Sequence, residues 1–240
     1  MEVEVAMQAR SAPVAVVTGA ASGIGAACAA ELSARGWITA GLDLAPASHV
    51  DLSATVDVQD ADDVARAMKR VSDELETPQA LVHAAGHYGT APFADLTPEM
   101  WNRMLRVHLG GLLNTSRALV PDLVARGNGS IVAIASEIAL GGGERTAHYA
   151  AAKGAVIGLV RSLASEVAGR GVRVNAVAPG PTDTPLLPPD SPERDPSLLA
   201  SLPARRLATP EEIALTVAFL LEEGSFFCGE VISPNSGAVI

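Results

Sequence analysis

Positive charge, aromatic side chains and cysteine are all scarce in this sequence of 240 residues. Lys and Arg number 17 against 27 Asp and Glu, which gives a net charge of −10. Such a chain is not expected to bind nucleic-acid phosphates or an anionic membrane surface. The two cysteines, Cys28 and Cys228, have neither C-x-x-C spacing nor a neighbouring histidine cluster. We therefore expect reduced thiols, with no disulfide and no metal site.

Long hydrophobic runs and an export signal are also missing. Every apolar stretch is interrupted by a charged residue or glycine before it reaches the roughly 20 residues of a membrane span. Residues 1–12, expected to form an N-terminal extension, carry Glu2 and Glu4 where a signal peptide would be positive. We therefore expect a cytoplasmic protein. Its length and its hydrophobic content of 48% fit one globular domain over residues 1–240.

The sequence does contain a regular alternation of short β-branched runs and longer helical segments. This alternation is typical of parallel strands joined by helical crossovers, and it predicts an α/β fold with a doubly wound parallel sheet. We expect about seven strands, with helices on both faces of the sheet. The predicted strands are residues 14–17, 38–43, 54–58, 80–84, 130–135, 172–177 and 230–233. Thr209 followed three residues later by Glu212 predicts a capping box for a helix over residues 211–221.

Proline is concentrated in residues 179–210, which hold nine of the 16 prolines. Long ordered insertions in compact α/β domains are usually functional. We therefore expect residues 185–208 to form a lid over the substrate, with a mobile surface loop as the alternative.

A glycine-rich turn follows the first predicted strand and precedes an alanine-rich helix. Glycine at such a turn lets the backbone approach a pyrophosphate at the helix N-terminus. The order of strand, turn and helix indicates a Rossmann-type nucleotide-binding domain. The candidate binding residues of the turn are Gly19, Ser22, Gly23, Ile24 and Gly25.

The second predicted strand ends at Asp43. A carboxylate at this position accepts hydrogen bonds from an adenosine ribose diol and would repel a 2′-phosphate. No Arg or Lys occurs between Gly36 and Arg66 to compensate that charge. We therefore predict NAD or NADH as the cofactor rather than the phosphorylated form; an aspartate that only forms a turn is the alternative.

Tyr149 and Lys153 lie one helical turn apart, in a chain with only two Tyr and two Lys. A phenol has a pKa near 10 and is a poor base at neutral pH unless a neighbouring cation stabilises the phenolate. Lys153 would supply that cation. Ser136 follows the fifth predicted strand, at the sheet edge where open parallel sheets bind ligands, and its hydroxyl could hold a substrate oxygen.

Taken together, TGAASGIG, Asp43, HAAG, the Ser136, Tyr149 and Lys153 spacing, and PGPTDT resemble the short-chain dehydrogenase/reductase family in its compact form. The resemblance extends from about residue 13 to residue 237. It implies hydride transfer at nicotinamide C4, with Tyr149 as general acid and base. Ser136 would orient the carbonyl or alcohol, and Lys153 would also bind the nicotinamide ribose.

The same resemblance implies further cofactor contacts. Ala84, Ala85 and Gly86 would support the adenosine, Asp57 and Val58 the adenine ring, and Pro179, Gly180, Thr182 and Thr184 the nicotinamide amide. Two positions depart from the family pattern: His83 and Ala84 replace a common Asn pair, and His108 stands where an Asn usually positions a water in a proton relay to the lysine. His108 could replace, retune or abolish that relay, or simply pack.

The resemblance implies an oxidoreductase that interconverts a secondary alcohol and a ketone, but it leaves the substrate open. A 3-oxoacyl thioester reductase or 3-hydroxyacyl dehydrogenase is one interpretation, although such reductases usually use NADPH, against which Asp43 argues. A catabolic dehydrogenase of cyclic or small secondary alcohols is the alternative, and a non-catalytic NAD-binding protein is the alternative of another class. Three arginines could meet a substrate carboxylate or phosphopantetheine group: Arg145, Arg205 and Arg206.

The family resemblance also implies a homotetramer. The helices expected at its interfaces are residues 99–124 and 148–167, where the small residues 150–155 would permit close packing. The apolar residues 237–240 fit either a subunit interface or a loose tail.

Overall fold

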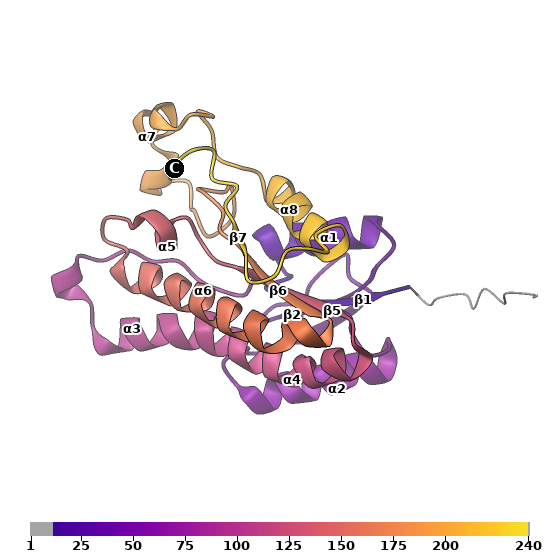
Figure 1. Cartoon of the computed structure of the whole chain (residues 1–240). Coiled ribbons are helices and arrows are strands. Elements are labelled where there is room, and N and C mark those ends of the chain that lie inside the picture. Colours follow the sequence, from indigo (N-terminus) through magenta and orange to yellow (C-terminus); the bar gives the residue numbers. More distant parts are fainter. Residues whose placement is uncertain (1–11, 240) are drawn as a thin grey trace, which may run out of the picture.

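Seven parallel strands form one sheet in the structure, a computed structural model that describes residues 12–239 (Figure 1). Their order across the sheet is β3-β2-β1-β4-β5-β6-β7, and every neighbouring pair is parallel. The predicted doubly wound α/β fold is therefore confirmed. The strands are β1 (Val14–Thr18), β2 (Ile38–Asp43), β3 (Leu52–Thr55), β4 (Ala80–His83), β5 (Gly129–Ile134), β6 (Val172–Val177) and β7 (Val231–Ile232).

Helices cover both faces of the sheet, because successive strand residues point to opposite sides. On one side, Ala15 and Val17 of β1 join a core with α1 (Gly23–Ala34) and α8 (Pro210–Glu222). On the other side, Val14 and Val16 join a core with α2 (Ala61–Glu74), α4 (Gly111–Arg126) and α6 (Ala147–Val167). In Figure 1, α1 and α8 lie above the sheet, and α2, α4 and α6 lie below it.

Shorter elements connect these layers. Before α4 come the 3₁₀ turn η1 (Phe93–Asp95), α3 (Pro98–Leu105) and a π-helical turn, η2 (Arg106–Gly110). α5 (Ile138–Gly141) follows β5, and the 3₁₀ turn η3 (Ala168–Arg170) follows α6. The predicted capping box is present: the Thr209 hydroxyl accepts from the Glu212 N–H, and the Glu212 carboxylate accepts from the Thr209 N–H. α8 is one residue longer at each end than predicted.

The third strand lies earlier in the chain than predicted. It spans Leu52–Thr55 rather than residues 54–58, because its partner β2 ends at Asp43, which pairs with Thr55. The chain then turns toward α2, where the carboxylate of Asp60 caps the first helical N–H groups. Asp57 and Val58 therefore lie in the loop after β3 and do not end the strand. β7 is likewise shorter than predicted, at two residues.

Residues 185–208, here called the lid segment, are folded against the body of the protein. They contain the 3₁₀ turn η4 (Pro192–Arg194) and α7 (Pro196–Ser201). Leu187 and Leu202 are buried, and an isolated bridge pairs Ala208, at the end of the segment, with Thr182, which lies just before it. Arg194 adds an ion pair with Asp183 at 2.5 Å and a hydrogen bond to the Leu187 carbonyl at 2.8 Å.

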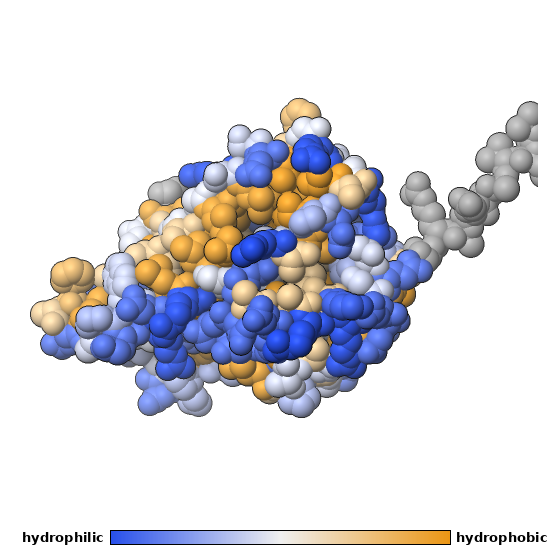
Figure 2. Space-filling model, turned by 90° about the horizontal axis from the view of Figure 1, so that it is seen from below, coloured by the Kyte–Doolittle hydropathy of each residue, from blue (hydrophilic) through white to orange (hydrophobic). Residues whose placement is uncertain are grey.

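One face of the molecule shows an apolar region. Figure 2 shows a band of hydrophobic residues flanked by hydrophilic ones on the face seen from below. Among residues 12–239, no helix combines the length and the apolar character that crossing a membrane requires. The expected N-terminal extension lies outside the described residues except for Ala12, as does Ile240 of the apolar C-terminus.

Candidate active site

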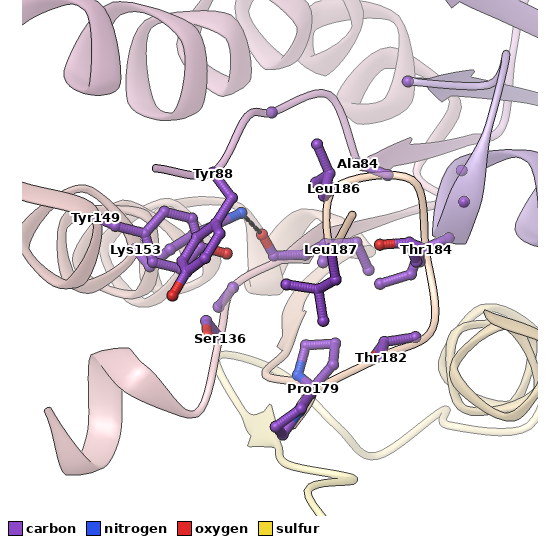
Figure 3. Close-up of a pocket in the computed structure, with 18 of the residues that line it drawn as sticks. Ala84, Tyr88, Ser136, Tyr149, Lys153, Pro179, Thr182, Thr184, Leu186 and Leu187 are labelled. Carbon is purple, nitrogen blue, oxygen red and sulfur yellow. Dashed lines mark hydrogen bonds between the residues drawn. The ribbon is translucent and has the colours of Figure 1, made fainter. Parts of the chain in front are cut away.

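A cavity of about 260 Å³ opens at the carboxyl ends of the central strands (Figure 3). It lies where the strand order reverses, between β1 and β4, as expected for ligand sites in open α/β sheets. Most predicted site residues line it: Gly19, Ser22, Gly23, Ile24, Gly25, Asp43, Ala84, Gly86, His108, Ser136, Tyr149, Lys153, Pro179, Gly180, Thr182 and Thr184. The others, Asp57, Val58 and Ala85, line an adjoining hollow of about 110 Å³.

The glycine-rich turn leaves no room for larger residues at two positions. A Cβ on Gly25 would lie 2.1 Å from the Gly19 carbonyl oxygen, which requires glycine there. Gly19 has a φ of +69°, and its Cβ would lie 2.9 Å from the Ala84 backbone. Ser22 is the N-cap residue of α1 and makes no side-chain hydrogen bond to the helix, whose first N–H groups have no partner within it. Ser22 and the first helical residues Gly23, Ile24 and Gly25 all line the cavity. This is the arrangement that binds a pyrophosphate.

Asp43 joins the end of β2 to this turn. Its carboxylate accepts hydrogen bonds from the Ala21 N–H at 3.0 Å and from the Ala45 N–H at 3.1 Å. The aspartate thus forms a turn and also faces both hollows. Among residues 12–239, Lys153 is the only Lys or Arg that lines either hollow, and it lies beside Tyr149 rather than beside Asp43. No basic side chain of the described lining accompanies Asp43.

Lys153 and Tyr149 both project from α6 toward the end of β5. The ammonium of Lys153 is buried and donates to the Ile134 carbonyl at 2.6 Å, the dashed line in Figure 3. It lies 5.7 Å from the centre of the Tyr149 ring. Burial lowers the pKa of Lys153 to about 7. Burial also raises the pKa of Tyr149, and the negative charge of Glu137 raises it further.

Ser136 lies two residues after the end of β5, and Figure 3 shows it near Tyr149. Its hydroxyl donates to Glu137 Oε2 at 2.9 Å and accepts from the Ile138 N–H at 3.2 Å. Glu137, which sequence reasoning missed, is only 8% exposed and lines the cavity. Its position directly after Ser136 is the signal that could have revealed it, since neighbouring residues at a strand end share one loop.

His108 lies in the π-helical turn and is buried against His87. Its Nε2 is 2.9 Å from the His87 carbonyl oxygen, and the two rings stack with centroids 5.4 Å apart. A Cβ on Gly86 would lie 2.4 Å from His108 Cε1, so glycine is needed beside this ring. Burial, and then the charge of Lys153, holds the pKa of His108 well below its usual value. The ring is a neutral wall of the cavity, held by the backbone.

His83, which departs from the family pattern, is buried at the end of β4. Its Nδ1 lies 3.1 Å from Thr18 Oγ1, and that hydroxyl also accepts from the N–H groups of Ala84 and Ala85. This network fixes the start of the loop after β4, where His83 and Ala84 stand in place of the usual Asn pair. Burial lowers the pKa of His83 to about 3. In the part of the chain that the structure describes, no three His, Cys, Asp or Glu side chains are grouped to hold a metal.

Tyr88 and Glu193 are two further missed residues. The Tyr88 hydroxyl donates to Glu193 Oε1 at 2.7 Å and so links the loop after β4 to the lid segment. The Tyr88 ring packs edge-on against Tyr149 at 5.0 Å, as Figure 3 shows. Tyr88 follows a central strand closely and is one of two tyrosines, which marks it in the sequence. Nothing marks Glu193 within its long proline-rich segment.

The three arginines considered for a carboxylate or phosphopantetheine group do not line the cavity. Arg206 instead pairs with Glu212 on α8, at 2.6 and 2.7 Å. Arg145 and Arg205 both have a positive φ on exposed loops. The structure therefore does not place these side chains at the reacting end.

Residues 19–238 match the family model described as enoyl-(acyl carrier protein) reductase. The chain is 38% identical over 237 residues to cis-4-hydroxycyclohexanecarboxylate dehydrogenase of Sinomonas cyclohexanicum, with 93% of this chain and 95% of that protein covered. It is 34% identical over 240 residues to a 3-oxoacyl-(acyl-carrier-protein) reductase of Thermotoga maritima, with 95% and 98% covered.

A solved structure is also similar throughout. Ligand-free aldohexose dehydrogenase of Thermoplasma acidophilum superposes with a TM-score of 0.88 at 28% identity, covering 94% of this chain and 93% of that one. The matching family model and the curated relatives show that the chain belongs to the short-chain dehydrogenase/reductase family, oxidoreductases that act on CH–OH groups with nicotinamide cofactors.

Proposed function

We propose that the protein is an NAD(H)-dependent oxidoreductase that interconverts a secondary alcohol and a ketone. The observation that carries the proposal is one cavity that is lined by Ser136, Tyr149 and Lys153 and also by the glycine-rich turn and Asp43. A protein that only bound the nucleotide would not need the first three side chains in contact with the same cavity. The non-catalytic alternative is therefore the less favoured one.

The residues present fit a dinucleotide. The free N-terminus of α1 and the glycine-rich turn would hold the pyrophosphate, and Asp43 the adenosine ribose. Asp57, Val58, Ala84, Ala85 and Gly86 would surround the adenine, and Pro179, Gly180, Thr182 and Thr184 the nicotinamide. Bound NAD would supply the hydride acceptor. The uncompensated Asp43 carboxylate supports NAD over NADP.

Tyr149 is the residue proposed to move the substrate proton. In alcohol oxidation its phenolate would take the hydroxyl proton, and in ketone reduction its neutral phenol would donate one. Because burial and Glu137 raise its pKa, the neutral phenol predominates near pH 7. Ser136 would bind the same substrate oxygen. To donate to that oxygen, the Ser136 hydroxyl must give up its hydrogen bond to Glu137. Lys153, held by the Ile134 carbonyl, would bind the nicotinamide ribose.

The similar proteins suggest two substrate classes. A 3-oxoacyl thioester reductase is supported by the description of the family model and by the Thermotoga maritima relative. A dehydrogenase of cyclic secondary alcohols is supported by the Sinomonas cyclohexanicum relative. The second class fits the preference for NAD that Asp43 suggests.

Assembly and location are part of the proposal. We expect a homotetramer, supported by Gly154 and Gly158 on α6, where an added Cβ would meet no atom within 4 Å, and by the half-exposed Leu113 on α4. The apolar band in Figure 2 is consistent with such contacts. A cytoplasmic location is supported by two free cysteines, Cys28 and Cys228.

The experiment that tests the function compares NADH with NADPH in the reduction of acetoacetyl-CoA and of cyclohexanone, followed by absorbance. We expect turnover with NADH, at a kcat/KM about tenfold or more above that with NADPH. A preference for NADPH would overturn the role given to Asp43. NADH binding without turnover of any ketone would support the non-catalytic alternative, and turnover of the thioester alone would assign the acyl class.

A further inference from the structure

Two glutamates that the hydride-transfer chemistry does not require face the reacting end of the cavity. Glu137 follows Ser136 directly, is 8% exposed and accepts the Ser136 proton at 2.9 Å. Its carboxyl group therefore lies beside the place where Ser136 would hold the substrate oxygen. Any substituent of the substrate next to that oxygen comes within reach of Glu137.

Glu193 approaches the same end from the lid segment. Its Oε1 accepts from the Tyr88 hydroxyl at 2.7 Å, and the Tyr88 ring packs against Tyr149. Its Oε2 is buried and has no hydrogen-bond partner among the described residues. A buried carboxylate oxygen without a donor is unfavourable, so this atom is suited to a donor that a ligand brings.

Of the basic residues that the structure describes, only Lys153 lines the cavity beside these carboxyl groups. Arg194 adjoins Glu193 in the chain, but its guanidinium is turned to Asp183 at 2.5 Å and to the Leu187 carbonyl at 2.8 Å. Burial, and more weakly the charge of Glu193, raises the pKa of Glu137. A substrate carboxylate would place its negative charge beside these two carboxyl groups in a partly desolvated site.

The rest of the substrate end is apolar. Ile138, Pro185, Leu186 and Leu187 line it, and Figure 3 shows Leu186 and Leu187 across the cavity from Tyr149. A ligand that suits these walls has one face of C–H groups and an edge of hydroxyl donors. An ammonium group is less suitable than hydroxyls, because Lys153 shares the cavity and would repel it.

We propose that Glu137 and Glu193 select an uncharged, hydroxyl-rich substrate, such as a sugar or a cyclic polyol, and exclude carboxylates. This inference rests on the proposed oxidoreductase function, whose substrate class it names. Each carboxyl group accepts hydrogen bonds from substrate hydroxyls other than the one that is oxidised. The substrate of the Sinomonas cyclohexanicum relative, a carboxylate, is then not the substrate here.

The test uses a matched pair with NAD: cis-4-(hydroxymethyl)cyclohexanol and cis-4-hydroxycyclohexanecarboxylate, which differ in a hydroxymethyl or a carboxylate group. We expect kcat/KM for the neutral diol to exceed that for the carboxylate by about tenfold or more. Plain cyclohexanol, which lacks the second hydroxyl, should fall below the diol. Equal or higher kcat/KM for the carboxylate would overturn the inference while leaving the oxidoreductase function intact.

Variants assign the selectivity to the two glutamates. Glu137→Gln and Glu193→Gln should each reduce the ratio of diol to carboxylate, and the double variant should reduce it most. Glu144→Gln, on the exposed loop before α6, is the matched control and should keep the wild-type ratio. An unchanged ratio in the double variant would contradict the proposal. If no alcohol is oxidised, calorimetry measures the affinity of the diol and of the carboxylate for the NADH complex. Tighter binding of the diol would support the proposal, and equal or tighter binding of the carboxylate would overturn it.

Discussion

Burial acts in opposite directions on the two ionisable side chains of α6. It raises the pKa of Tyr149, since the phenolate is costly to bury, and it lowers the pKa of Lys153 to about 7, since the ammonium is costly as well. Just above pH 7, Tyr149 is therefore mainly a neutral phenol and Lys153 mainly a neutral amine. Alcohol oxidation, which needs the phenolate, should be faster at alkaline pH than at neutral pH.

Glu137→Gln should shift the pH dependence of alcohol oxidation. The Glu137 charge raises the pKa of Tyr149, so its removal stabilises the phenolate and lowers that pKa. The acidic limb of kcat/KM for oxidation should move to lower pH, as measured by NADH formation across a pH series. The control Glu144→Gln should leave the acidic limb in place. An acidic limb that also stays in place in Glu137→Gln would show that Glu137 does not act on Tyr149.

Lys153→Met should remove a pH dependence of stability. The pKa of Lys153 is about 7 in the folded protein and about 10.4 when unfolded, so the unfolded state binds more protons between these values. The free energy of unfolding should rise with pH in this window, by up to about 1.4 kcal/mol per unit. Urea titrations should show this slope in the wild type and not in Lys153→Met.

The control for that experiment is Lys69→Met on α2. Lys69 is exposed and pairs with Asp73 at 2.6 Å on the surface. This variant should keep the wild-type slope. Equal slopes in the wild type and both variants would contradict the burial of an ammonium at position 153.

At the scale of elements, the turn between β1 and α1 depends on Gly25. In Gly25→Ala the new Cβ would lie 2.1 Å from the Gly19 carbonyl, so the turn must move. NADH should bind at least about tenfold more weakly, as measured by its fluorescence. Ala30→Ser, on the exposed side of α1, should bind normally. Wild-type affinity in Gly25→Ala would show that the turn does not hold the dinucleotide.

The strand predictions were correct where hydrophobic residues are buried in the sheet. They were wrong at strand ends that are set by pairing with a neighbouring strand. β2 and β6 have the predicted bounds, and most of their residues are buried in the sheet. β3 differs because its end is set by Asp43 of a neighbouring strand, a contact that no local pattern contains. The capping box of α8 was predictable because both partners, Thr209 and Glu212, lie within one turn.

The same distinction holds for the site. Ser136, Tyr149 and Lys153 could be found from spacing and from their position at strand and helix ends. Glu193 could not, because its place beside Tyr88 depends on how a proline-rich segment folds back over 105 positions of chain. The effect of burial on the pKa of Tyr149 could not be predicted either, since burial is a tertiary property.

At the scale of the whole molecule, the α4 and α6 face offers close contact to a second copy of the chain. Gly154 and Gly158 leave open space on α6, and Leu113 on α4 is 51% exposed. Light scattering should give a mass several times that of the chain. Leu113→Arg should lower this mass, because burying an unpaired guanidinium is unfavourable.

Leu198→Arg on α7 is the control for that variant, since Leu198 is 39% exposed in the lid segment, away from this face. It should keep the wild-type mass. A wild-type protein that scatters as a single chain would contradict the expected assembly.

The central claim is hydride transfer at a site where Tyr149 moves the proton, and the most direct measurement follows the transferred atom. Cyclohexanol deuterated at its carbinol carbon is incubated with NAD and the protein, and the NADH formed is analysed by mass spectrometry. We expect deuterated NADH from the wild type, and formation slower by about 100-fold or more in Tyr149→Phe. NADH binding should persist in that variant. NADH without deuterium, or an undiminished rate in Tyr149→Phe, would contradict the account.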